Sequence, residues 1–160
     1  MGDFSPHYSE HEFRSRGRPL APGTVGAYRN LSVGTLEPAH EIAERIAGQR
    51  IIGKVISGQR LPDHNTAVGG APKSYHLPPE DAGRSGRFEV AADVRYKTMG
   101  GTTLSGATHA RIAEAVRAGM KAGRIPKGGA SSYHEEWNPG APGKEPFVHL
   151  DNRGYLAAWE

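Results

Sequence analysis

Apolar residues recur at helical spacing in two segments of the chain. The first segment runs from about residue 36 to 47, and Thr35 is placed to cap its start. The second runs from about residue 104 to 121, and Thr103 is placed to cap it. We therefore predict two principal helices.

Three shorter segments have the pattern of β-strands. Arg50–Ser57 is a compact run rich in β-branched residues that stops at a glycine. Phe88–Tyr96 alternates strictly, which puts Asp93 on the side away from its most apolar positions. Pro146–Asp151 is the third. Together with the helices, these segments predict an α+β fold with a small, mainly antiparallel sheet and two principal flanking helices.

The remaining segments are rich in glycine and proline. The two types make up 34 of the 160 residues, about 21% against a usual total of about 12%. Residues 1–34 lack a sustained period, so we predict a loop-rich N-terminal arm, with a short helical turn near residues 9–13, packed on a single domain of residues 35–160. Residues 61–87 are predicted to form a long loop, and loops of this length are usually functional or disordered.

The absence of cysteine limits the chemistry that the chain can perform. It excludes disulfide scaffolds, thiol catalysis and thiolate metal sites, so any metal must be held by the eight histidines and the carboxylates. The net charge of +3 helps approach to anionic polymers without selecting one, and the Arg14, Arg16 and Arg18 cluster lacks the aromatic platforms of a nucleic-acid binder. We find no export signal and no membrane-spanning run, and expect neither a nucleic acid nor a membrane as partner.

The third predicted strand contains the clearest constellation. Its period of two places His149 and Asp151 on one side, about 7 Å apart along the strand. A lone strand histidine is more often a structural residue, so this pair by itself does not define a site.

Three motifs occur in order along the chain: SGQRLPDHNTAVGGAPKSYHL at 57–77, AADV at 91–94 and FVHLDNRG at 147–154. With these motifs the chain resembles the zinc peptidases of the D-alanyl-D-alanine carboxypeptidase and bacteriophage endolysin type, whose fold is shared by the Hedgehog signalling domain. The resemblance covers about residues 4–154 and is strongest from Ser57 onward.

The resemblance implies a zinc ion held by His76, Asp93 and His149. Two imidazoles and one carboxylate suit zinc, and three protein ligands leave the fourth position open for water. An ion in such a site lowers the pKa of bound water and polarises a carbonyl, as a hydrolase requires. The family usually has six residues between its first histidine and the aspartate, whereas sixteen intervene here. Glu80 or Asp81 is the alternative to Asp93 as the carboxylate ligand.

The resemblance also assigns roles to polar residues around the metal. Arg60 matches an arginine that faces the substrate and stabilises an oxyanion. Ser74 either binds substrate or ties down its loop. Many relatives have a proton-transferring glutamate three residues before the last histidine, but Pro146 stands there. Asp151 is our first candidate for proton transfer and Glu145, of the same strand parity, is the second; alternatively Asp151 only orients His149.

The remaining histidines and acidic residues carry weaker signals. Three acidic or imidazole side chains that precede the last predicted strand are less direct candidates for proton transfer: His134, Glu135 and Glu136. We expect His64 to organise its turn. Four other histidines are expected to face solvent: His7, His11, His40 and His109.

By the resemblance, the protein is expected to hydrolyse peptide bonds in bacterial peptidoglycan, as a carboxypeptidase or endopeptidase, with the stem peptide as substrate. The missing export signal then fits a phage endolysin that passes from the host cytoplasm to the cell wall, or a virion-associated lysin with other virion proteins as partners. The alternative is a phage structural or tail component, or a binding module, that keeps a zinc site with little or no catalysis. The missing glutamate favours that alternative.

Overall fold

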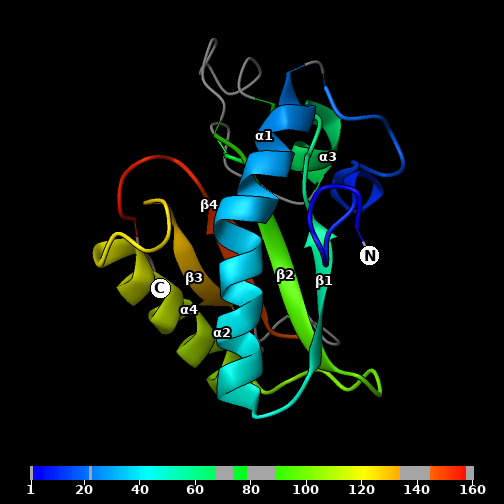
Figure 1. Cartoon of the computed structure of the whole chain (residues 1–160). Helices are drawn as coiled ribbons and strands as arrows, with labels where there is room; N and C mark the ends of the chain where they lie inside the picture. Colours follow the sequence, from blue (N-terminus) through cyan, green and yellow to red (C-terminus); the bar gives the residue numbers. More distant parts are fainter. Residues whose placement is uncertain (1, 22, 68–73, 79–88, 134–144, 158–160) are drawn as a thin grey trace.

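A computed structural model describes residues 2–21, 23–67, 74–78, 89–133 and 145–157 (Figure 1). It contains a four-stranded sheet in the order β1-β2-β4-β3, and every neighbouring pair is antiparallel. The strands are β1 Ile51–Ser57, β2 Ala91–Thr98, β3 Ala130–Tyr133 and β4 Phe147–Asp151. The predicted α+β fold with a small antiparallel sheet is confirmed.

The principal helices lie together on one face of the sheet. They are α1 Thr24–Leu31, the π-helical turn η2 Ser32–Leu36, α2 Glu37–Ala47 and α4 Gly106–Lys121. Figure 1 shows α1 and α2 as one continuous column beside α4, with the sheet behind them. Two short helices, η1 Glu10–Phe13 and α3 Pro62–Ala67, complete the described elements.

The helix that ends at Ala47 begins earlier than the sequence pattern indicates. The expectation of loop structure up to residue 34 is wrong for residues 24–34, which are helical. Thr35, the expected N-cap, lies buried inside this run. The π-helical turn precedes Pro38, whose missing N–H interrupts the α-helical hydrogen-bond ladder. The run continues because tertiary packing buries Tyr28 and Leu31 in the core.

The alternation of the strands separates a core face from a site face. Ala92 and Val94 of β2 are fully buried in the core cluster, beside Val148 and Leu150 of β4. Residue 93 therefore projects from the other side of the sheet, away from the helices. In the sheet register Asp93 is paired with His149 and Ala92 with Leu150, so the two polar residues share the site face.

Two elements and one cap differ from the sequence-based expectation. Strand β3 was not predicted, because ASSY is short and has no alternation of apolar and polar residues. Helix α3 lies within the expected loop of residues 61–87. Helix α4 begins after Ser105 rather than Thr103, and the Ser105 hydroxyl accepts a hydrogen bond from the backbone N–H of Thr108.

Two of the four histidines expected to face solvent are buried. His109 is 0% exposed: its Nε2 accepts the backbone N–H of Tyr96 at 3.0 Å, and its Nδ1 lies 2.9 Å from the Ser105 carbonyl. His40 is 1% exposed and stacks on His7 with ring centroids 3.9 Å apart. The expectation rested on their polar or helical settings, but strand β2 covers His109 and the N-terminal segment covers His40. Among the described residues, no helix has the length and apolar character needed to cross a membrane.

Gly58 allows the N-terminal segment to approach the end of β1. A Cβ at this position would lie 2.5 Å from the Phe13 Cα and 2.7 Å from its carbonyl oxygen. We expect Gly58→Ala to lower the free energy of unfolding by about 1–3 kcal/mol, because backbone atoms must move to admit the methyl group. Urea unfolding measures this loss. Gly26→Ala is the control, since a Cβ there meets nothing within 4 Å; equal stability of the two variants would contradict the proposed contact.

Candidate metal centre

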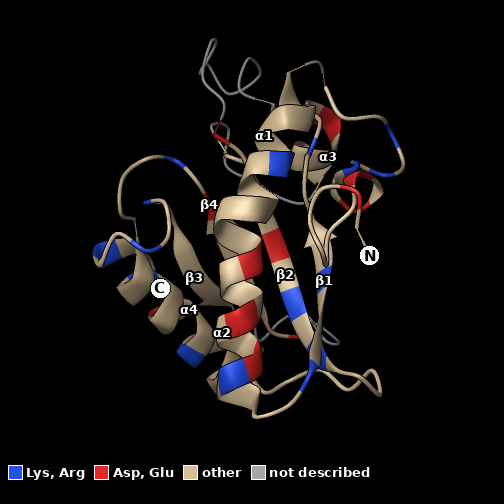
Figure 2. Cartoon of the chain, viewed as in Figure 1, with Lys and Arg blue, Asp and Glu red and all other residues tan. Residues whose placement is uncertain are grey.

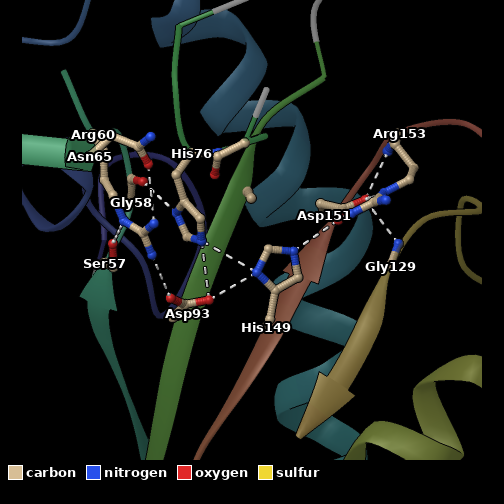
Figure 3. Close-up of polar contacts among 12 residues, drawn as sticks. Ser57, Gly58, Arg60, Asn65, His76, Asp93, Gly129, His149, Asp151 and Arg153 are labelled. Carbon is tan, nitrogen blue, oxygen red and sulfur yellow. Dashed lines mark hydrogen bonds and ion pairs between the residues drawn. The ribbon is translucent and has the colours of Figure 1, made fainter. Parts of the chain in front are cut away.

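Three polar side chains from separate parts of the chain meet on the site face of the sheet (Figure 3). Asp93 comes from β2 and His149 from β4, where they are direct cross-strand partners. His76 comes from the described segment 74–78, and its carbonyl accepts the backbone N–H of Arg60 at 2.7 Å. The three residues predicted as metal ligands are thus brought together.

Their facing atoms form a triangle of the size that a zinc ion requires. The Asp93 Oδ1 lies 3.2 Å from His76 Nε2 and 3.0 Å from His149 Nδ1, and the two nitrogens are 3.3 Å apart. Zinc bonds of about 2.0–2.1 Å in tetrahedral geometry place neighbouring ligand atoms about 3.3 Å apart. The triangle therefore matches one face of a tetrahedral site.

Hydrogen bonds on the far side of each ligand set its orientation. The His76 Nδ1 lies 2.8 Å from the Gly58 carbonyl, and the His149 Nε2 lies 2.9 Å from the Asp151 carboxylate. When these nitrogens carry the proton, His76 Nε2 and His149 Nδ1 present lone pairs toward Asp93. This arrangement of an imidazole between a metal position and a hydrogen-bond acceptor is typical of protein metal sites.

The centre is largely withdrawn from solvent. The exposed fractions of His76, Asp93 and His149 are 3%, 4% and 8%. Within the described part of the chain the group contains these three residues and no fourth histidine or carboxylate. A tetrahedral ion held here would keep one position for a non-protein ligand.

Burial and mutual contact shift the pKa values of the group in different directions. Burial lowers the pKa of His76. Burial alone would raise the pKa of Asp93, but the neighbouring His76 and His149 hold it well below its usual range. Burial alone would lower the pKa of His149, but hydrogen bonds to Asp151 and Asp93 raise it to about 9. Without a metal, the group is an ion-paired cluster with protonated His149.

Arg60, to which the resemblance assigns a substrate-facing role, contacts the carboxylate of Asp93. Its Nη2 donates to Asp93 Oδ2 at 3.3 Å, its Nε to Ser57 Oγ at 3.1 Å and its Nη1 to Asn65 Oδ1 at 3.4 Å. The sheet register shifts between Val55 and Ser57, and this irregularity puts Ser57 opposite Asp93. The guanidinium is therefore held beside the carboxylate by three acceptors.

The contacts of Ser74 match one of its two proposed roles. Its hydroxyl accepts the backbone N–H of His76 at 3.1 Å, which ties down the loop that presents the ligand. His64 lies in α3, with its Nδ1 2.9 Å from the Ser15 hydroxyl, and takes no part in the centre.

Asp151 lies behind His149 and is surrounded by donors. It is 0% exposed. Its carboxylate contacts His149 Nε2, receives the backbone N–H of Gly129 at 2.8 Å and is bound by Arg153 through Nε at 2.8 Å and Nη2 at 2.5 Å. Burial alone would raise the pKa of Asp151, but His149 and Arg153 lower it below its usual range. These contacts suit a carboxylate that orients His149, the role left open beside proton transfer.

Glu145 lies outside the group. It is exposed, and its carboxylate is 3.6 Å from the Arg95 Nε. It lies four positions before His149, about 13 Å along an extended chain. Several other sequence candidates lie outside the described residues: Glu80, Asp81, His134, Glu135 and Glu136.

Arg153 and Gly129 were missed as parts of the site. Arg153 keeps the spacing of two from His149 and Asp151, but it lies beyond the end of β4 at Asp151, so the strand period does not place it. Gly129 carried no signal, because it reaches Asp151 only through the pairing of β3 with β4.

The three side chains have the chemical type, spacing and orientation of metal ligands. It is a candidate metal centre. No family model, no curated protein and no solved structure matches the chain. The geometry therefore supports a buried His-Asp-His group able to hold a metal ion, within an α+β fold, and neither the ion nor a reaction is identified by comparison.

We expect Arg153→Met to weaken metal binding by about 10- to 100-fold, because Asp151 loses the partner that fixes it against His149. Competition with a chromophoric chelator measures the dissociation constant, and a thermal melt reports whether the fold persists. The control is Arg111→Met, an exposed position on α4. Unchanged affinity in the Arg153 variant would contradict the orienting role.

Proposed function

We propose that the protein is a zinc-dependent hydrolase of peptide bonds in bacterial peptidoglycan. The observation that carries the proposal is the three-ligand centre, which has no fourth protein ligand among the described residues. Structural zinc sites usually have four protein ligands, whereas catalytic sites usually have three. The choice of peptidoglycan is supported by the ordered motifs at 57–77, 91–94 and 147–154, which resemble carboxypeptidases and endolysins of the cell wall.

The residues of this chain then have distinct roles. His76, Asp93 and His149 would hold the ion, which supplies Lewis acidity toward the scissile carbonyl and lowers the pKa of a water molecule when bound. Arg60, beside Asp93, would donate hydrogen bonds to the oxygen that becomes negative as the amide is attacked. Asp151 would keep the His149 ring in the ligand orientation.

A specific observation favours the second candidate, a binding module or phage structural component that keeps the metal without efficient turnover. Proton transfer needs a group within about 3.2 Å of the reacting atoms, or one water away. Among the described residues, Asp151 is enclosed by its donors and Glu145 lies too far along the strand for direct transfer. No other carboxylate of the described chain joins the centre.

Metal content and cleavage, measured together, separate the two functions. Purified protein is analysed for zinc by mass spectrometry and incubated with a purified peptidoglycan digest, and new amino termini are identified. The hydrolase predicts one zinc per chain and loss of a stem-peptide bond, suppressed by a chelator and restored by zinc. Zinc without cleavage would establish the binding module, and a protein that binds no metal would overturn both functions.

The proposed location follows from the proposed substrate. We propose a lysin that reaches the wall from the host cytoplasm during phage lysis, or one carried on the virion with other virion proteins. Fractionation of phage particles distinguishes these, because only the second places the protein in purified virions.

A further inference from the structure

Three basic residues lie on the site face of the sheet, directly beside the metal centre. Arg95 and Lys97 follow Asp93 along β2 with the period of two that keeps side chains on one face. Lys54 of β1 is paired with Arg95 across the sheet. We call Lys54, Arg95 and Lys97 the basic strip. Figure 2 shows basic positions on both β1 and β2.

This arrangement of like charges does not stabilise the fold. Like charges directly opposite on neighbouring strands are destabilising. Arg95 is partly compensated, since its Nε lies 3.6 Å from the Glu145 carboxylate and its guanidinium donates to the carbonyls of Glu145 and Pro146. Lys54 and Lys97 have no ion pair with any residue that the structure describes. Lys54 is exposed and Lys97 half-buried, so both ammonium groups are available to an anionic ligand.

The strip also has a defined distance from the metal centre. Along β2, Arg95 lies about 7 Å and Lys97 about 13 Å from Asp93. An extended peptide advances about 3.3–3.6 Å per residue. If the scissile carbonyl of an extended peptide sits at the centre, the peptide residues two to four positions from that carbonyl lie over the basic strip.

We infer that the basic strip binds free carboxylates of the substrate, so that the centre acts on acidic peptides whose carboxylates lie two to four residues to one side of the scissile bond. This inference rests on the proposed function and deepens it. Arg60 is held at the centre itself by Asp93, Ser57 and Asn65, so it does not replace the basic strip as an anchor for carboxylates two to four residues away.

Binding of two matched peptides tests the inference. They have the sequence of a peptidoglycan stem peptide and carry a fluorophore, and they differ only in that one has free carboxylates and the other amides. Fluorescence anisotropy is titrated at constant ionic strength with the protein as purified. The titration is then repeated with a zinc chelator, which prevents cleavage of the peptide. We expect the free-carboxylate peptide to bind about tenfold more tightly, as two solvent-accessible ion pairs allow.

The variant is Lys54→Gln combined with Lys97→Gln, which should remove this preference. The control, Arg111→Gln combined with Lys121→Gln, makes the same charge change at exposed positions of α4 and should retain it. Equal affinity of the parent for both peptides, or a preference that survives in the Lys54 and Lys97 variant, would overturn the inference. A preference without cleavage would count against the hydrolase alone, and cleavage without a preference would count against the strip alone.

Discussion

Replacing His76 with alanine is expected to remove stoichiometric zinc and to reduce peptide-bond cleavage by about a thousandfold or more. The imidazole supplies one of three ligands, and the remaining Asp93 and His149 are too few to hold an ion in tetrahedral geometry. The Lewis acidity of a bound metal contributes several kcal/mol to the transition state, and about 4 kcal/mol corresponds to a thousandfold in rate.

Two measurements make this test specific. Zinc content is determined after dialysis against metal-free buffer, and cleavage is followed on the same peptidoglycan digest as for the parent. His11→Ala is the control, because His11 is exposed in η1 and outside the centre. Retention of zinc and of parental activity in the His76 variant would show that the group is not the functional metal site.

Zinc affinity is expected to rise about tenfold per pH unit between roughly pH 7 and 9. In the metal-free protein, hydrogen bonds to Asp151 and Asp93 outweigh the effect of burial and raise the pKa of His149 to about 9. The metal competes with the proton for Nδ1, so each unit of pH below that value costs about one factor of ten in affinity. Burial lowers the pKa of His76, which therefore adds no proton in this range.

The stability of the metal-free protein should change with pH in the opposite sense. Because the folded pKa of His149 is raised, its contribution is fully present below about pH 6.5 and lost as the pH rises through about 9, a change on the order of 3 kcal/mol. Asp93 and Asp151 have lowered pKa values, so their contribution is present above about pH 4 and lost on further acidification. The lowered pKa values of the buried His76, His40 and His109 reduce stability as the pH falls below about 6.5, so maximum stability is expected near pH 6.5.

Chelator competition at a series of pH values measures the first effect, and chemical denaturation after metal removal measures the second. His149→Gln is the informative variant for the second effect, since it should flatten the loss of stability toward pH 9. A metal affinity independent of pH would show that His149 is neutral in the metal-free protein, contrary to its contacts with two carboxylates.

Local patterns predicted most of the regular elements. The second predicted helix, 104–121, is observed as Gly106–Lys121, and the predicted strands 50–57 and 146–151 are observed as Ile51–Ser57 and Phe147–Asp151. Hydrophobic periodicity is a property of neighbouring residues, so it can be read without knowledge of the fold. Helix α1 was missed because its stability comes from burial of Tyr28 and Leu31 rather than from its own pattern.

For the site, the sequence by itself determined the ligand types and one local relation. The lack of cysteine restricts the ligands to imidazole and carboxylate, and the strand period places His149 and Asp151 on one face. Both follow from composition and from backbone geometry over a few residues.

Only the tertiary structure decided the rest. Pairing of β2 with β4 sets Asp93 against His149, and the approach of the loop at Gly58 brings in His76 from seventeen positions before Asp93. Burial of Asp151 beneath Arg153 and Gly129 favours orientation over proton transfer for that carboxylate. The physical reason is that burial and pairing depend on segments far apart in the chain, whose contacts no local period records.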